Sequence, residues 1–230
     1  MLPQAIRVFF ERRPDPNVEL TTQQIQEMRA DPLSNLEYFA EWGASVWLDM
    51  LRQIVTKDLG TEWFQGKRVL EIGSRFGRIS TLFALLGAEV TGIDVVDEHR
   101  VAAEKEAARF GVQERAQFLT ADATEHCLAH ANAFDLVFSK SVLVLFPDLD
   151  KFLAAAHGSL RSEGIFTAIE NGRGGFLLRT LRHLRPKGYN HSHIQYFDQS
   201  RLDLVKAEFP NVELTSTDFP PVHKMVAKRS

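Results

Sequence analysis

The residues with the clearest chemical potential lie between Val69 and Ile79, where a short apolar run leads into two glycines. Gly73 and Gly77 allow the backbone to approach a ligand closely and to adopt conformations that other residues avoid. Ligands of open α/β sheets bind beyond the carboxyl ends of the strands. We therefore expect the turn from Gly73 to Gly77 to form one wall of a binding crevice.

Two further carboxylates follow at a spacing that suits a nucleotide. Asp94 ends an apolar run about 20 residues after Gly73, where an acidic residue can accept hydrogen bonds from ribose hydroxyls. Asp122 ends the next apolar run, whereas we interpret Asp97 as the cap of a following helix and not as a ligand. The sequence thus places Glu71, Gly73, Asp94 and Asp122 along one edge of a sheet.

Apolar runs and helical stretches alternate from Lys67 onwards, which predicts the sheet that positions these residues. Continuous apolar strands separated by helices are typical of a parallel sheet covered on both faces. The expected strands are 68–73, 89–94, 116–121, 134–139 and 164–170. The expected helices in this part are 79–86, 98–110 and 149–160.

The end of the chain departs from this pattern. Two strand-like segments, 211–218 and 222–228, are joined by Phe219-Pro220-Pro221, and so short a connection allows only an antiparallel hairpin. We therefore predict an α/β fold with a Rossmann-like, mostly parallel seven-stranded sheet and a terminal antiparallel hairpin. Residues 1–230 are expected to form a single domain, with a helical cap in 1–60 and the core in 61–230.

The predicted cap contains two helices after a short N-terminal one. Thr21 or Thr22 could cap a helix that extends through Arg29. Ser34 and Glu37 have the spacing of a capping box, which predicts a long helix from there to about Lys57. Apolar residues recur along it every three or four positions, as expected for one buried face.

At this point the sequence resembles the class I S-adenosylmethionine-dependent methyltransferases over roughly residues 60–228. Their first motif is similar to acid-x-Gly-x-Gly-x-Gly; Glu71, Gly73 and Gly77 match it, while Arg75 replaces the central glycine. The resemblance implies S-adenosylmethionine as the cofactor and methyl transfer as the reaction. It implies that Asp94 binds the ribose and that Asp122-Ala123 contacts the adenine. The implied cofactor-binding residues are Glu71, Gly73, Ser74, Arg75, Gly77, Asp94, Val95, Asp122, Ala123 and Ser139.

The composition limits the class of methyl acceptor and the cell compartment that we expect. The net charge is −3, whereas proteins that grip nucleic acid usually carry a basic surplus. The single cysteine, Cys127, cannot form an internal disulfide or a Cys-rich zinc site, and we interpret it as a packing residue. No apolar run approaches the roughly 20 residues that span a bilayer. We expect a cytoplasmic enzyme with a small-molecule acceptor, no metal, and no nucleic-acid or membrane partner.

Candidate acceptor-binding groups lie after the fifth predicted strand. A general base is needed only if the acceptor must lose a proton, and the candidates are Glu170, His191, His193 and Tyr196. Arg179 and Arg182 belong to a basic stretch whose simplest interpretation is the solvated side of an amphipathic helix. The sharper hypothesis is that they bind an acidic group of the acceptor.

Three alternatives stay open from the sequence alone. A nicotinamide-dependent oxidoreductase is disfavoured because Gly73-x-x-x-Gly77 is not Gly-x-Gly-x-x-Gly. A non-catalytic relative, which binds the cofactor or a partner, is raised by Arg75. A nucleic-acid or protein methyltransferase is disfavoured by the acidic balance and by Ser139-Lys140-Ser141-Val142, which stands where amino-methylating nucleic-acid enzymes carry Asn/Asp-Pro-Pro-Tyr.

Overall fold

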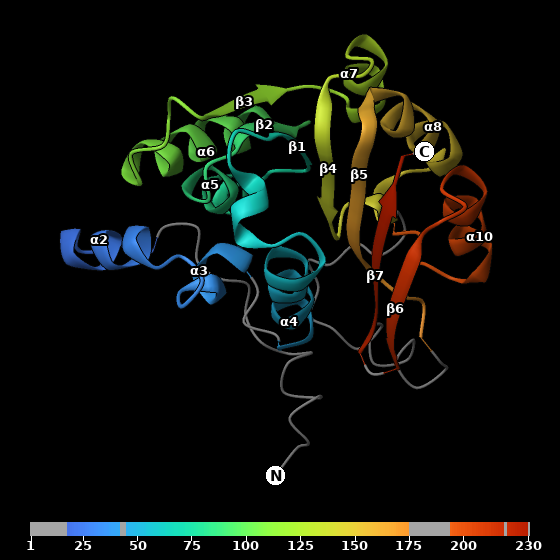
Figure 1. Ribbon diagram of the computed structural model, residues 1–230, viewed down its shortest axis with the longest axis horizontal. Coiled ribbons are helices and arrows are strands. Elements are labelled where there is room, and N and C mark those ends of the chain that lie inside the picture. Colours follow the sequence, from blue (N-terminus) through green and yellow to red (C-terminus); the bar gives the residue numbers. More distant parts are fainter. Residues whose placement is uncertain (1–17, 42–44, 175–193, 219, 230) are drawn as a thin grey trace.

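A seven-stranded sheet forms the centre of the computed structural model, which describes residues 18–41, 45–174, 194–218 and 220–229. The strand order is β3-β2-β1-β4-β5-β7-β6 (Figure 1). The first five strands pair in parallel, and β7 runs antiparallel to both β5 and β6. The predicted Rossmann-like sheet with a terminal antiparallel hairpin is therefore confirmed.

The strands are β1 (Arg68–Ile72), β2 (Glu89–Asp94), β3 (Ala116–Thr120), β4 (Phe134–Lys140), β5 (Leu160–Asn171), β6 (Glu213–Asp218) and β7 (Pro221–Lys228). The α-helices are α2 (Thr22–Ala30), α3 (Leu36–Ala40), α4 (Ser45–Gln53), α5 (Arg78–Leu85), α6 (Asp97–Arg109), α7 (Ala123–Ala129), α8 (Leu149–Ser159) and α10 (Gln199–Glu208). A π-helix, η1 (Ile54–Asp58), and two 3-10 helices, η2 (Thr61–Phe64) and η3 (Leu143–Leu145), complete the described elements. No described helix has the length and apolar character needed to cross a membrane.

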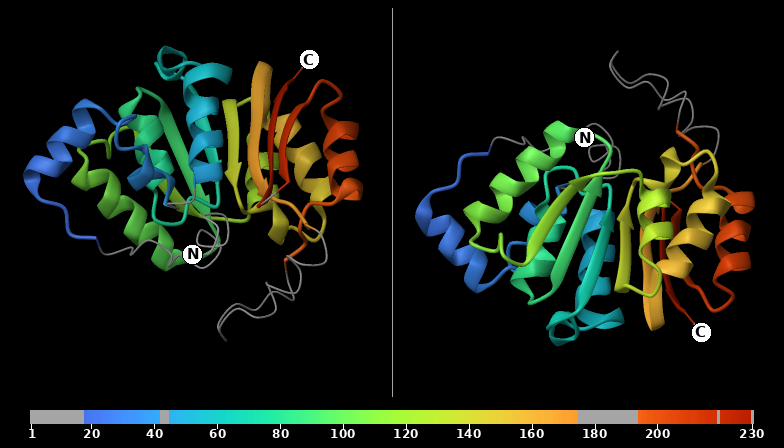
Figure 2. Two further views of the ribbon diagram at one scale, coloured as in Figure 1. Left: turned by 90° about the horizontal axis from the view of Figure 1, so that it is seen from below. Right: turned by 90° about the horizontal axis from the view of Figure 1, so that it is seen from above.

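Helices cover both faces of the sheet (Figure 2), as its continuous apolar strands require. Val69 of β1 packs with the α4, α5 and α6 side, whereas Leu70 packs with the α7, α8 and α10 side. Cys127 lies in this second layer and is 1% exposed. Burial raises the pKa of its thiol to about 11, so the thiol stays protonated at neutral pH, in agreement with a packing role.

The helical cap differs from the prediction in two places. The capping box forms at Thr21 and Gln24, at the start of α2, and not at Ser34. Ser34 instead donates a hydrogen bond to Asp31, and α3 begins without a side-chain cap. The predicted continuous helix to Lys57 is wrong as well, because Glu41 adopts a left-handed conformation with φ 60° and ends α3.

Apolar packing and an ion pair with a buried lysine join the cap to the sheet. Leu51 and Ile54 are fully buried in the layer that covers β5 and β7. Lys224 of β7 is 6% exposed, and its Nζ lies 2.5 Å from Oδ2 of Asp58 at the end of η1. Removing one partner of such a pair leaves the other charge buried and uncompensated.

We expect Asp58→Asn to lower the free energy of unfolding by about 2 kcal/mol, because Lys224 loses its counter-charge. Urea denaturation of wild type and variant measures this change. Adding Lys224→Met to Asp58→Asn should restore most of the loss. Asp148→Asn is the matched control, because its pair with Lys151 is exposed and such pairs contribute little. An equal loss in Asp58→Asn and Asp148→Asn would contradict this account.

Candidate functional site

The turn between β1 and α5 is packed too tightly for side chains at its glycines. Gly73 and Gly77 both have φ 71°, in the left-handed region that favours glycine. A Cβ at position 73 would overlap the side chain of Val142, and one at position 77 would lie 2.6 Å from Cβ of Ala103. Gly73 also donates its backbone N–H to the carbonyl of Ile93, 2.8 Å away. The turn is therefore fixed between β2, α6 and the segment after β4.

Arg75, which replaces a motif glycine, also adopts a left-handed conformation, with φ 48°. Its backbone N–H donates to Oδ2 of Asp94 at 3.1 Å, so the substitution keeps the turn against the end of β2. Its guanidinium stacks over Phe76 at 4.4 Å, and its Nη1 lies 3.4 Å from Oε2 of Glu41. Phe76 and Glu41 thus both contact the guanidinium, which lies at the edge of the turn.

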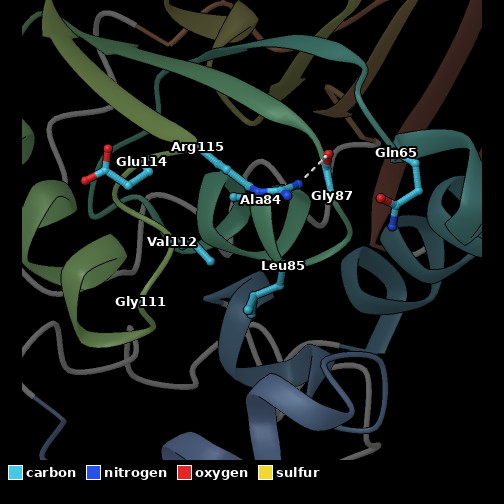
Figure 3. A pocket seen from close by; sticks show the side chains of 8 residues that line it. All are labelled: Gln65, Ala84, Leu85, Gly87, Gly111, Val112, Glu114 and Arg115. Carbon is cyan, nitrogen blue, oxygen red and sulfur yellow. Dashed lines mark hydrogen bonds between the residues drawn. The ribbon is translucent and has the colours of Figure 1, made fainter.

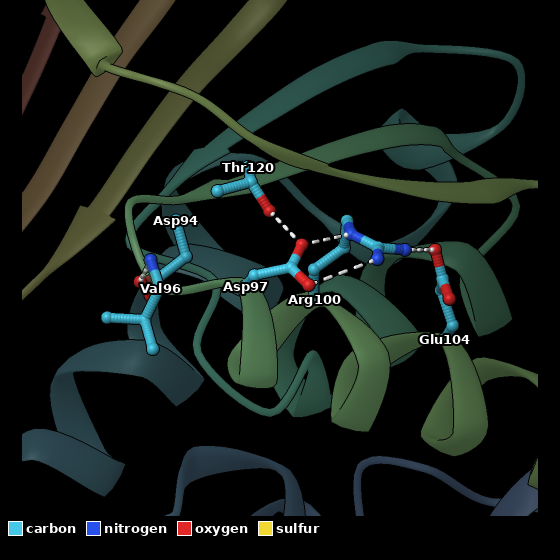
Figure 4. Close-up of polar contacts among 6 residues, drawn as sticks. All are labelled: Asp94, Val96, Asp97, Arg100, Glu104 and Thr120. Carbon is cyan, nitrogen blue, oxygen red and sulfur yellow. Dashed lines mark hydrogen bonds and ion pairs between the residues drawn. The ribbon is translucent and has the colours of Figure 1, made fainter.

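Two carboxylates at the start of α6 have different partners (Figure 4). Asp94 ends β2, and its Oδ1 accepts a hydrogen bond from the backbone N–H of Val96 at 3.0 Å. Asp97 instead accepts hydrogen bonds from Arg100 and Thr120. The N-cap residue of α6 is Val96, so the capping role predicted for Asp97 is wrong.

Asp122 occupies the corresponding position at the end of β3. It is the N-cap of α7, and its Oδ1 accepts a hydrogen bond from the backbone N–H of Glu125 at 3.0 Å. Ala123 follows it into the buried side of the helix. Val95, between β2 and α6, is 72% exposed and lines the same side of the sheet edge as Asp122. Such a residue suits the surface of a flat apolar ligand.

These segments surround a cavity of about 510 Å³ at the carboxyl edge of the parallel strands. Its volume falls in the range of sites for small molecules and cofactors. Seven of the ten residues implied as cofactor-binding line this cavity: Glu71, Gly73, Arg75, Asp94, Val95, Asp122 and Ala123. The remaining three, Ser74, Gly77 and Ser139, lie outside its lining.

Ser139 lies behind the wall of the cavity and acts on it through Glu170. Its hydroxyl donates to Oε1 of Glu170 at 3.2 Å, and that oxygen also accepts the backbone N–H groups of Val142 and Leu143. Burial raises the pKa of Glu170 to about 7. This carboxyl therefore fixes the segment after β4, the same segment that packs against Gly73.

Four charged side chains gather at one end of the cavity: Glu41, Glu71, Arg75 and Lys140. Glu71 is buried, accepts a hydrogen bond from Ser80, and has a pKa that burial raises to about 8. Lys140 donates to the carbonyl of Ala40, and burial lowers its pKa to about 8 although Glu41 and Glu71 oppose the shift. Sequence reasoning missed Glu41 and Lys140. A charge at the carboxyl end of an apolar strand was the available signal for Lys140.

Of the predicted acceptor-binding residues, the structure describes Glu170 and Tyr196 but not the others. His191, His193, Arg179 and Arg182 lie outside the described residues. Tyr196 lines a separate hollow of about 460 Å³, together with Arg173 and Asp198. This hollow shares Pro147 with the larger cavity, so the two are neighbours, but Tyr196 does not line the larger one.

A further hollow, of about 330 Å³, lies at the opposite edge of the sheet (Figure 3). Residues that precede β1, β2 and β3 line it, and Arg115 donates to the carbonyl of Gly87 at 3.1 Å. Ligands of open α/β sheets bind at the carboxyl ends, so we assign no role to this amino-terminal hollow. Among the described residues, no three His, Cys, Asp or Glu side chains are grouped to hold a metal ion.

We expect the stability of Glu71→Gln relative to wild type to increase as the pH rises from 5 to 9. Folded wild type keeps the Glu71 proton up to a pKa of about 8, whereas the unfolded chain releases it near 4.5. Wild type therefore loses stability across this interval relative to a variant that cannot ionise. Thermal melts of both proteins at several pH values measure the difference in Tm. A difference that does not change with pH would show that this carboxyl is not held protonated.

Comparison with known proteins relates this chain to methyltransferases. Residues 70–168, from β1 into β5, match the family described as "Methyltransferase domain". The chain is 29% identical over 215 residues to the "Ubiquinone biosynthesis O-methyltransferase" of Aromatoleum aromaticum, an alignment that covers 85% of this chain and 89% of that protein. Its counterpart in Paramagnetospirillum magneticum is 34% identical over 103 residues, which cover 45% of this chain but only 40% of that protein.

A solved structure shares the fold at low sequence identity. The magnesium protoporphyrin IX methyltransferase of Synechocystis PCC 6803, determined with bound S-adenosylhomocysteine, superposes with a TM-score of 0.60. The superposition covers 98% of this chain and 92% of that one, at 15% identity. The match identifies residues 70–168 as a methyltransferase domain, and the superposition shows that the chain shares the fold of S-adenosylmethionine-dependent methyltransferases.

Proposed function

We propose that this methyltransferase transfers a methyl group to an oxygen atom of a small-molecule acceptor. The observation that carries the proposal is the cavity at the carboxyl edge, into which the ends of β1, β2 and β3 bring Gly73, Asp94 and Asp122. The choice of oxygen rests on the relatives, which are named as O-methyltransferases of ubiquinone biosynthesis. A cytoplasmic location and a single domain over 1–230 remain predictions from the sequence.

The residues of the cavity suit the parts of S-adenosylmethionine. Asp94 uses its oxygens for backbone N–H groups, and Nδ1 of His99 lies 3.1 Å from Oδ1. A carboxylate oxygen can accept more than one hydrogen bond, so Oδ2 suits a ribose hydroxyl. Asp122 caps α7 with one oxygen only, so the other is available to the amino group of adenine. Val95 and Ala123 supply apolar surface beside it. The absence of a side chain at Gly73 allows the backbone to approach the methionine part.

Methyl transfer needs orientation more than it needs acid–base chemistry. Bound S-adenosylmethionine supplies a methyl group that its sulfonium already activates, so the protein contributes chiefly proximity and alignment. A hydroxyl acceptor must also lose its proton, which calls for a base. His191 and His193 stay proposals for this role, and Lys140 joins them because it lines the cavity with a pKa lowered to about 8. Arg179 and Arg182 stay proposals for binding an acidic acceptor group.

The alternative functions lose support. In the common dinucleotide-binding order 3-2-1-4-5-6 no strand enters between the fifth and sixth, whereas here an antiparallel β7 does. The matched domain belongs to methyltransferases, which removes the argument for an oxidoreductase. The non-catalytic alternative rested on Arg75, whose left-handed conformation and bond to Asp94 preserve the turn.

We expect Asp94→Ala to weaken binding of S-adenosylhomocysteine by at least about tenfold, because it removes hydrogen bonds to a charged acceptor. Calorimetric titration of wild type and variant measures this loss. Asp97→Ala is the matched control, since Asp97 stands three positions away but does not line the cavity. Similar losses in Asp94→Ala and Asp97→Ala would argue for a general disturbance of α6. No binding to wild type would contradict the proposed site.

We expect Lys140→Met to lower kcat and to remove the rise of kcat with pH through about 8, because the neutral amine of wild type accepts the proton. Initial rates with methyl-labelled S-adenosylmethionine and a panel of phenols, amines and carboxylic acids identify the acceptor and then measure this profile. Label on amines alone would contradict the proposal of oxygen. A rise through pH 8 that persists in Lys140→Met would exclude Lys140 as the base.

A further inference from the structure

One carboxylate oxygen in the wall of the cavity lacks a hydrogen-bond partner. Oε1 of Glu41 is buried and has no partner among the described residues, and the residue as a whole is 9% exposed. A buried acceptor without a partner costs free energy, and in a native structure such a group calls for an explanation such as a functional role or a bound ion or water. Glu41 lines the cavity, so a ligand bound there is placed to supply a donor to this oxygen.

A cation stands beside this acid at the same end of the cavity. Nη1 of Arg75 lies 3.4 Å from the other oxygen of Glu41, Oε2. The side chain of Arg75 is 25% exposed and that of Glu41 is 11% exposed, so both belong to the wall and neither is a solvated surface group. A guanidinium has five N–H donors in a planar fork, and the contact with Glu41 uses one nitrogen only. The pair therefore offers an anion and a cation to the same ligand.

The two other charges at this end of the cavity already have close partners. Glu71 accepts the hydroxyl of Ser80, and Lys140 donates to the carbonyl of Ala40. A ligand group that brings both a positive and a negative charge is thus matched best by Glu41 and Arg75. In the cofactor of a methyltransferase, the methionine part carries such a pair of groups, an α-ammonium and an α-carboxylate.

We propose that Glu41 and Arg75 form a receptor for the amino-acid end of the cofactor, with Oε1 of Glu41 accepting the α-ammonium and the Arg75 guanidinium binding the α-carboxylate. The proposal rests on the proposed cofactor cavity. It gives Arg75 a task at the position where the family motif has glycine. It also makes the cap part of the cofactor site, because Glu41 is the residue at which α3 ends.

Two ligands that differ only in the amino-acid end test this receptor. S-adenosylhomocysteine carries the ammonium and the carboxylate, whereas 5′-methylthioadenosine keeps the adenine, ribose and sulfur without them. We would titrate both calorimetrically into wild type, Glu41→Gln and Arg75→Ala. Glu37→Gln is the matched control, because Glu37 lies on the same helix, is exposed and does not line the cavity.

Glu41→Gln and Arg75→Ala should each weaken the binding of S-adenosylhomocysteine by at least about tenfold. Each should change the affinity for 5′-methylthioadenosine by less than about twofold. Retained methylthioadenosine binding reports that the cavity is still folded in each variant. Equal losses for both ligands would mean that Glu41 and Arg75 only support the fold, which overturns the receptor. Unchanged binding of both ligands overturns it too, while leaving the cofactor cavity intact. Failure of wild type to bind either ligand would instead remove the cavity assignment itself.

Discussion

The absence of a side chain at Gly73 is the constraint on which the cavity depends. The turn after β1 passes directly against Val142, and a Cβ at position 73 would occupy the space of that side chain. Val142 is held in turn by its backbone N–H, which donates to Glu170 at the end of β5. The first, fourth and fifth strands are therefore locked together at their carboxyl ends, and the cavity opens between fixed walls.

Two carboxylates also stabilise the backbone at the carboxyl ends of the parallel strands. Asp94 accepts backbone N–H groups from the turn after β1 and from the start of α6, and Asp122 accepts one from the first turn of α7. Each bond uses only part of the accepting capacity of its carboxylate. The same residues can therefore position the backbone before a ligand arrives and still face that ligand. Such preorganisation lowers the conformational cost of binding.

The sequence was most informative where structure is local. Strand and turn residues around Gly73 follow from apolar runs and glycine chemistry, and Asp94 and Asp122 follow from their places at strand ends. The break at Glu41 could not be predicted in this way, because the residue is held in a left-handed conformation next to Arg75, far away in the chain. Lys140 could not be predicted for the same reason, since its role depends on Glu41, Glu71 and the carbonyl of Ala40, which lie far away in the chain. Ser139 suited the strand-end pattern, but its hydroxyl donates to Glu170 and it does not line the cavity.

The most direct test of the central claim is a crystal structure of the protein with S-adenosylhomocysteine. The account predicts ligand density in the cavity between the ends of β1 and β3, with the ribose hydroxyls on Asp94 and the adenine beside Asp122 and Val95. Density at the amino-terminal edge of the sheet, or a cavity that stays empty at saturating ligand, would contradict it.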